Sequence, residues 1–189
     1  MAIPRSMKHF AGSLSGLATL SVVLLAAAVA LSKSAGAQYF SGAQVSGHVG
    51  VAFPLVTFTT APNVSSPTTI ANDLNVNLPF GLGVKPLWSP VVFDLELVPE
   101  IHSHTGASAT FLVHPGVVLP LSEGWAIGLR AAFEIDQNSY GFTPLVIKGF
   151  PNPGSSVHWF VEGDLPVRFS SNGAGGTSVT FAIHTGLAF

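Results

Sequence analysis

Residues 177–189 read Thr-Ser-Val-Thr-Phe-Ala-Ile-His-Thr-Gly-Leu-Ala-Phe, and this stretch decides the fold. Large apolar side chains recur at every second position except Thr185, and the residues between them are small or polar. Because successive side chains of a β-strand point to opposite faces, the pattern predicts a strand with one apolar face. A water-soluble domain rarely places a free carboxylate directly after a large apolar strand residue. The apolar positions are Val179, Phe181, Ile183, Leu187 and Phe189.

The N-terminal residues have the organisation of an export signal. Arg5 and Lys8 form a basic region, residues 17–31 are apolar or small, and Ala35-Gly36-Ala37 offers a small-x-small cleavage site. The apolar run is shorter than the ~20 residues that a membrane-spanning helix needs, which disfavours the alternative of an uncleaved anchor. We therefore expect residues 1–37 to be a signal peptide cleaved after Ala37, and residues 38–189 to form one domain.

The composition indicates a chain that does not face water with its whole surface. Charged residues make up only 8% of the sequence, against roughly 25% in ordinary soluble domains. The chain has no cysteine, so neither disulfides nor thiolate metal sites can form. After residue 37 no apolar stretch is long enough for a transmembrane helix. Since only helices and closed barrels satisfy their backbone hydrogen bonds in lipid, these features favour a transmembrane barrel.

Seven further segments repeat the alternation of the last one. The clearest is 125–136, whereas 140–150 is ambiguous because Lys148 shares a face with Phe142 and Val146. Eight strands of this length suit an all-β, antiparallel, up-and-down transmembrane β-barrel. The strands of a soluble β-sandwich also alternate between apolar and polar residues. A face exposed to water would, however, be rich in Lys, Glu and Thr, whereas the polar faces of this chain carry many small residues. The seven segments are 43–55, 74–84, 91–102, 109–121, 125–136, 140–150 and 157–169.

The connections and the prolines refine this expectation. The connections 85–90, 122–124 and 151–154 are short and rich in Pro or Gly, as turns on one side of a membrane would be, whereas Thr59–Asp73 is long and polar. Proline cannot donate to a strand ladder, so some prolines must mark bulges or strand ends. The prolines concerned are Pro54, Pro79, Pro99, Pro115, Pro120, Pro144 and Pro166.

On these segments the chain resembles the small OmpA/OmpX-like eight-stranded outer-membrane barrels over residues 40–189, at the level of fold and without a family-specific motif. The resemblance implies a place in the outer membrane of a Gram-negative cell, in contact with lipid and lipopolysaccharide. It also implies that the assembly machinery of that membrane reads the last strand at Phe189. The short connections then become periplasmic turns, and Thr59–Asp73 becomes an external loop. Four aromatic residues are expected as a belt at the periplasmic rim: Trp88, Trp125, Trp159 and Phe189.

The polar faces of the strands carry the candidate site residues. A narrow interior must pair its charges, and Arg130 bridging Glu96 and Glu162 is the expected centre. Carboxylates outnumber cations, so protonated histidines, shared protons, exposure at the mouth or a bound cation must balance the rest. The expected charge network is Asp94, Glu96, His114, Arg130, Glu134, Asp136, Glu162, Asp164 and Arg168. The interior histidines His48, His158 and His184 follow no metal-ligand spacing, so we assign neither a metal nor a cofactor.

Fold alone does not give function. We expect a non-enzymatic barrel that supports membrane integrity or binds a surface partner through the Thr59–Asp73 loop. A narrow porin-like channel is one alternative, and a lipid A-modifying enzyme is another. The enzyme would use a His and a Ser near the membrane edge, for which His102, Ser103 and His104 are the nearest match, but we assign no catalytic residue. The acidic balance of the chain disfavours nucleic-acid binding.

Overall fold

The structure is a computed structural model that describes residues 38–40, 42–61, 67–102, 108–135, 137–170 and 176–189. The expected signal peptide lies outside these ranges. No helix in the described ranges is long and apolar enough to cross a membrane. The elements are β1 (Gln38–Phe40), β2 (Ala43–Thr60), β3 (Thr68–Thr69), β4 (Asn75–Asn77), β5 (Phe80–Pro86), β6 (Val92–His102), β7 (Ser108–Pro120), the 3₁₀ turn η1 (Ser122–Gly124), β8 (Trp125–Ile135), β9 (Ser139–Phe150), β10 (His158–Asp164), β11 (Val167–Ser170) and β12 (Gly176–Ala188).

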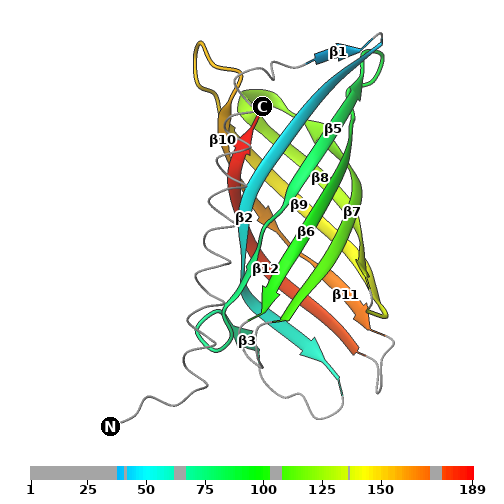
Figure 1. Ribbon diagram of the computed structural model, residues 1–189, viewed down its shortest axis with the longest axis vertical. Coiled ribbons are helices and arrows are strands. Elements are labelled where there is room, and N and C mark those ends of the chain that lie inside the picture. The colour runs from blue at the N-terminus through cyan, green and yellow to red at the C-terminus, as the bar shows by residue number, and fades with distance from the viewer. Residues whose placement is uncertain (1–37, 41, 62–66, 103–107, 136, 171–175) are drawn as a thin grey trace. The chain divides into compact units, whose positions relative to one another are not determined.

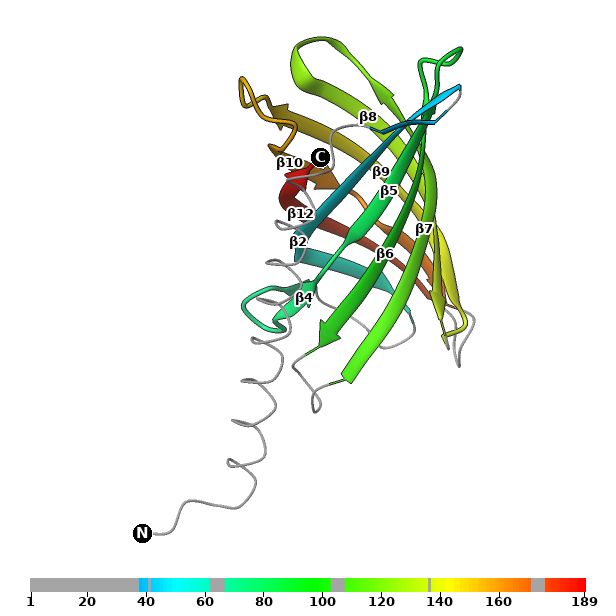
Figure 2. The ribbon, with the colours of Figure 1, turned by 45° about the horizontal axis from the view of Figure 1, so that its top comes forward.

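The strands form one antiparallel sheet that closes into a ring (Figures 1 and 2). Neighbours in the ring follow the chain from β2 to β12, with β4 and β5 sharing one position and β10 and β11 sharing another. The first and last long strands close the ring, because β12 pairs with β2 from Thr177–Thr60 to Ala188–His48. Each of the eight segments expected from the sequence therefore corresponds to one position in the ring.

The prolines lie largely where the ladder is interrupted. β2 has a bulge at Leu55, directly after Pro54, and the register with β12 shifts there. Pro79 separates β4 from β5, Pro166 separates β10 from β11, and Pro120 ends β7. The carbonyl groups at the two breaks still accept ladder hydrogen bonds, at 2.9 Å for Pro79 and 2.8 Å for Pro166. The remaining three, Pro99, Pro115 and Pro144, lie inside β6, β7 and β9.

The bulge corrects the expected end of the first strand. Segment 43–55 was expected to end at Leu55, but β2 continues to Thr60 and the facing of its side chains changes at Leu55. Beyond the bulge, Phe58 is exposed and Thr57 Oγ1 hydrogen-bonds Thr180 Oγ1 at 2.9 Å. Thr59 and Thr60 therefore belong to a strand rather than to the expected loop 59–73. The described end of that loop returns to β2 through β3, and residues 62–66 lie outside the description.

The apolar faces of the strands point out of the ring, and the polar faces point into it. Side chains of β8 show this plainly, because Ile127, Leu129 and Phe133 are exposed while Arg130 is buried. The structure also resolves the ambiguous segment 140–150, where Val146 faces outward and Leu145 is buried. The interior is therefore polar at its centre and the outer surface is apolar, the reverse of a water-soluble sheet protein.

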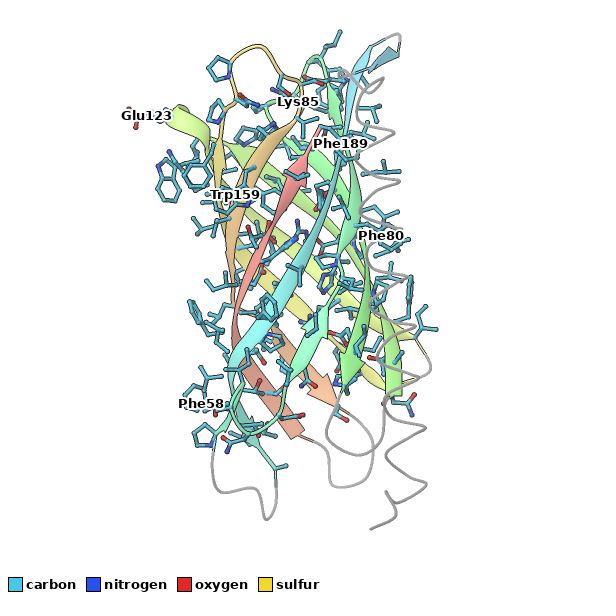
Figure 3. All side chains as sticks on the ribbon, turned by 60° about the vertical axis from the view of Figure 1, so that its left-hand side comes forward. Phe58, Phe80, Lys85, Glu123, Trp159 and Phe189 are labelled. Atoms are coloured by element: carbon cyan, nitrogen blue, oxygen red, sulfur yellow. The ribbon has the colours of Figure 1, made fainter. Side chains whose placement is uncertain are left out.

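One end of the ring carries the short turns, and we call it the short-turn end; the other is the long-loop end. The three tryptophans and Phe189 lie at the short-turn end, and Figure 3 shows Trp159 and Phe189 there, far from Phe58 at the opposite end. Trp88, Trp125 and Trp159 are exposed. The ring of Phe189 lies against Gly47, and the backbones of the two residues exchange hydrogen bonds of 2.8 and 2.9 Å.

Candidate functional site

A cluster of buried ionisable side chains lies in the middle of the ring. We call it the interior charge cluster, and its members come from β2, β6, β7, β8, β10 and β12. Register brings them together, since Asp94 pairs with Gly116, Gly116 pairs with Arg130, and Glu162 pairs with His184. The members are His48, Asp94, Glu96, His114, Arg130, Glu162 and His184.

Arg130 is the central cation of this cluster. It is 2% exposed, and its Nη1 donates to Glu162 Oε1 at 2.6 Å and lies 3.5 Å from Glu96 Oε2. The expected bridge between Glu96 and Glu162 is therefore present. Its Nε also donates to Asp94 Oδ2 at 2.7 Å, a contact in addition to the bridge that the sequence predicted. One guanidinium thus pairs with two carboxylates and approaches a third, and all three carboxylates are buried.

Glu96 is the acceptor for two histidines. His48 Nε2 lies 3.0 Å from Glu96 Oε2, and His114 Nδ1 lies 3.1 Å from Glu96 Oε1. On its other side His114 Nε2 faces Arg168 Nη2 at 2.9 Å. Because an arginine can only donate, His114 Nε2 must accept that bond, and its proton must sit on Nδ1, facing the carboxylate. His114 is therefore held as a neutral imidazole of defined tautomer.

His184 is the most enclosed histidine of the cluster. Its Nδ1 lies 3.3 Å from Glu162 Oε1, and its Nε2 has no hydrogen-bond partner among the described residues. That Nε2 points at Gly50, where a Cβ atom would come within 2.5 Å of it. Gly81 makes room for His48, and Gly116 for Arg130, in the same way. These glycines were missed as part of the site, although they stand at polar-face positions of the alternating pattern.

The three interior histidines do not form a set of their own. His48 and His184 join the cluster, with ring centroids 6.1 Å apart, whereas His158 lies near the short-turn end against Gly149. Among the described residues, the one group of three or more potential metal ligands whose atoms all lie within 4.8 Å of one another is Glu96, Glu162 and His184. Arg130 pairs with Glu162 and lies within ion-pair distance of Glu96, so the positive charge in this group comes from the protein itself.

Three further residues of the expected network, Glu134, Asp164 and Arg168, lie toward the long-loop end. Arg168 Nη1 donates to Thr143 Oγ1 at 3.1 Å. The sequence did not predict this partner, because the facing of segment 140–150 was ambiguous. Asp164 is 8% exposed, and its Oδ1 has no partner among the described residues. Glu134 lies in the same part of the interior. Asp136 lies outside the described residues.

Of His102, Ser103 and His104, the residues considered for lipid A chemistry, the structure describes His102. His102 Nδ1 lies 3.1 Å from Asn75 Oδ1, and His102 Nε2 lies 3.2 Å from Thr110 Oγ1. Thr110 in turn donates to Glu100. Ser103 and His104 lie outside the described residues.

Two cavities flank the interior charge cluster. The short-turn cavity has a volume of about 590 Å³, and the long-loop cavity has about 210 Å³. Arg130 lines both, with His48, Asp94 and Glu162 facing the first and His114 and His184 facing the second. The interior charge cluster therefore separates the short-turn cavity from the long-loop cavity.

No protein family matches this chain, and no curated protein or solved structure matches it either. Function must therefore be argued from the geometry above.

Proposed function

We propose that residues 38–189 form an eight-stranded transmembrane β-barrel in a bacterial outer membrane, of the small OmpA/OmpX-like kind. Its role is non-enzymatic: it supports membrane integrity or binds a surface partner through the loop that follows β2. The observation that carries the proposal is the inverted distribution of side chains. Large hydrophobic side chains cover the outside of the ring, while Asp94, Glu96, Arg130 and Glu162 are buried inside.

The size of the apolar surface supports a lipid environment. Among the described residues, 23 large hydrophobic side chains are exposed, several of them by half or more. Leaving one such side chain in water rather than burying it costs about 1.5–3 kcal/mol, so the whole set amounts to tens of kcal/mol in water. Lipid removes that cost. On the outward face of β9, Lys148 lies at the short-turn end, where it donates to Glu123 O and stacks on Trp125.

The dimensions of the ring also fit a bilayer. Following the register once around the ring from His48 leads back to β2 at Thr59, a stagger of eleven residues that includes the bulged Leu55. Without the bulged residue, the stagger is ten residues for a ring of eight strands. A stagger of this size corresponds to strands tilted by roughly 40° from the axis of the ring. Tilted strands of 11–13 residues, as in β7, β8 and β9, rise by roughly 30 Å along the axis, enough for an apolar band of ~25 Å.

Cell fractionation and gel migration test this proposal. The full chain, expressed in a Gram-negative host, should appear in the outer-membrane fraction and migrate faster before boiling than after it. An aspartate in place of Leu129, whose side chain is 49% exposed at the middle of β8, should lower the amount of the fast-migrating form. Recovery of the chain as a soluble periplasmic protein would overturn the proposal.

A narrow channel is a second candidate, because a cavity lies on each side of the interior charge cluster. In that case Arg130 and its carboxylate partners act as the barrier between the two hollows. Purified protein in planar bilayers would then show small currents, and Arg130→Ala would raise them. If the current is absent in both proteins, the cluster only seals the interior.

A further inference from the structure

The two cavities of the ring differ in chemistry. The walls of the short-turn cavity are mainly apolar and include Val92, Val118, Ile147 and Phe160. The lining of the long-loop cavity is more evenly mixed: apolar residues such as Val98 and Leu112 stand beside asparagine, threonine, serine and several ionisable side chains. A cavity that only held water at the open end of a ring would need no apolar walls. Its volume of about 590 Å³ lies within the range of small-molecule sites.

The short-turn cavity ends on a charged floor. Asp94, Glu162, Arg130 and His48 all line it, so the floor carries two carboxylates, one guanidinium and the imidazole that contacts Glu96. Its described lining contains no lysine and no second arginine. Glu96, at 3.5 Å from Arg130, adds a third negative charge directly behind the floor. The electrostatic potential at the bottom of the cavity therefore favours a cation over an anion.

Asp94 offers the contact point for such a cation. Arg130 Nε engages only its Oδ2, at 2.7 Å. Arg130 does not use its Oδ1, and the Asp94 side chain, which is 7% exposed, lines the cavity. Glu162, by contrast, is engaged through both oxygens by Arg130.

We propose that the short-turn cavity is a binding site for a small amphiphilic cation, with its ammonium group on Asp94 Oδ1 and its apolar body against Val118, Ile147 and Phe160. A charge-assisted hydrogen bond at the floor fixes the orientation, and the apolar walls supply most of the contact area. The inference concerns the cavity, and its test in lipid nanodiscs rests on the proposed membrane-spanning barrel, which gel migration before and after boiling tests separately.

The experiment uses naphthylmethylammonium as the probe, with naphthylmethanol as the neutral and naphthoate as the anionic comparison. Each is titrated calorimetrically into the full-length protein in lipid nanodiscs, and empty nanodiscs measure partition into lipid. The ammonium should bind about tenfold more tightly than the alcohol, and the carboxylate should show no binding beyond that of the empty discs. Equal binding of the ammonium and the alcohol would overturn the assignment of a cation.

Variants locate the binding. Asp94→Asn should lower the affinity for the ammonium about tenfold and leave the alcohol unchanged, because only the charge is removed. Ile147→Trp should abolish binding of both by filling the cavity. Glu100→Gln, in the long-loop cavity, is the matched control and should change neither affinity. Gel migration before and after boiling shows whether each variant is folded.

A measurement on the unaltered protein guards against variants that fail to fold. Bound naphthylmethylammonium should give nuclear Overhauser contacts to the methyl groups of Val118, which face the cavity. It should give none to those of Val117, which is 41% exposed on the outer surface. Contacts to Val117 alone would place the probe in lipid and refute the site.

Discussion

Replacing Arg130 with methionine tests the central claim about the interior, namely that one buried guanidinium holds the carboxylates together. The methionine keeps much of the side-chain volume and removes the charge. It takes away the hydrogen bonds to Asp94 at 2.7 Å and to Glu162 at 2.6 Å, as well as the closest cation to Glu96.

The magnitude follows from burial. Arg130, Glu162 and Asp94 are 2%, 1% and 7% exposed, so water replaces the lost partner only in part. Removing one member of a buried ion pair typically costs about 3–5 kcal/mol, because the other charge stays buried without compensation. Histidines still contact Glu96 and Glu162, whereas Asp94 loses the one ion-pair partner that it has among the described residues. We therefore expect the free energy of unfolding of Arg130→Met to fall by about 3–5 kcal/mol.

Equilibrium unfolding in urea measures this change, with the protein in lipid vesicles and the folded fraction read from tryptophan fluorescence and from migration of unboiled samples. The control combines Arg130→Met with Asp94→Asn and Glu162→Gln. Neutralising the partners removes the unpaired charges, so this triple variant should recover most of the lost stability. If Arg130→Met lowers the free energy of unfolding by less than about 1 kcal/mol, or if the triple variant is no more stable than the single one, the reasoning is refuted.

The outer surface and the interior glycines give two further predictions. Leu129→Arg, at the middle of β8, should destabilise the protein in lipid by about 2–4 kcal/mol, whereas Leu121→Arg at the short-turn end, equally exposed, should cost at most about 1 kcal/mol. Similar costs at both sites in vesicle unfolding would argue against a membrane-spanning ring. Gly116→Ala places a Cβ atom 2.6 Å from Arg130 Cγ and should cost about 1–3 kcal/mol, while Gly163→Ala meets nothing within 4 Å and serves as its control. Indistinguishable unfolding curves for the two alanine variants would show that Gly116 is not needed to seat Arg130.

Local alternation in the sequence was sufficient to predict the strands and most of their faces, although not those of segment 140–150. Segment 125–136 became β8 (Trp125–Ile135), and its polar face placed Arg130 inside. This works because the facing of a strand residue depends only on its parity along the strand. The same rule failed at Leu55, where a bulge inserts one residue and reverses the parity for the rest of β2. Pro54 signalled a bulge or a strand end but could not say which.

The facing of each strand residue was not enough to predict which side chains join the interior charge cluster. The sequence by itself determined that Glu96, Arg130 and Glu162 face inward near mid-strand, because that information is local to each strand. Only the tertiary structure decided that Asp94 reaches Arg130, that His184 joins Glu162 and that His158 stays apart. The physical reason is the stagger of the closed ring: each pair of strands adds its own register, and the sum fixes which heights coincide across the interior. No single segment encodes that sum, so the partners of Arg130 and the two cavities beside it emerge only when β12 meets β2.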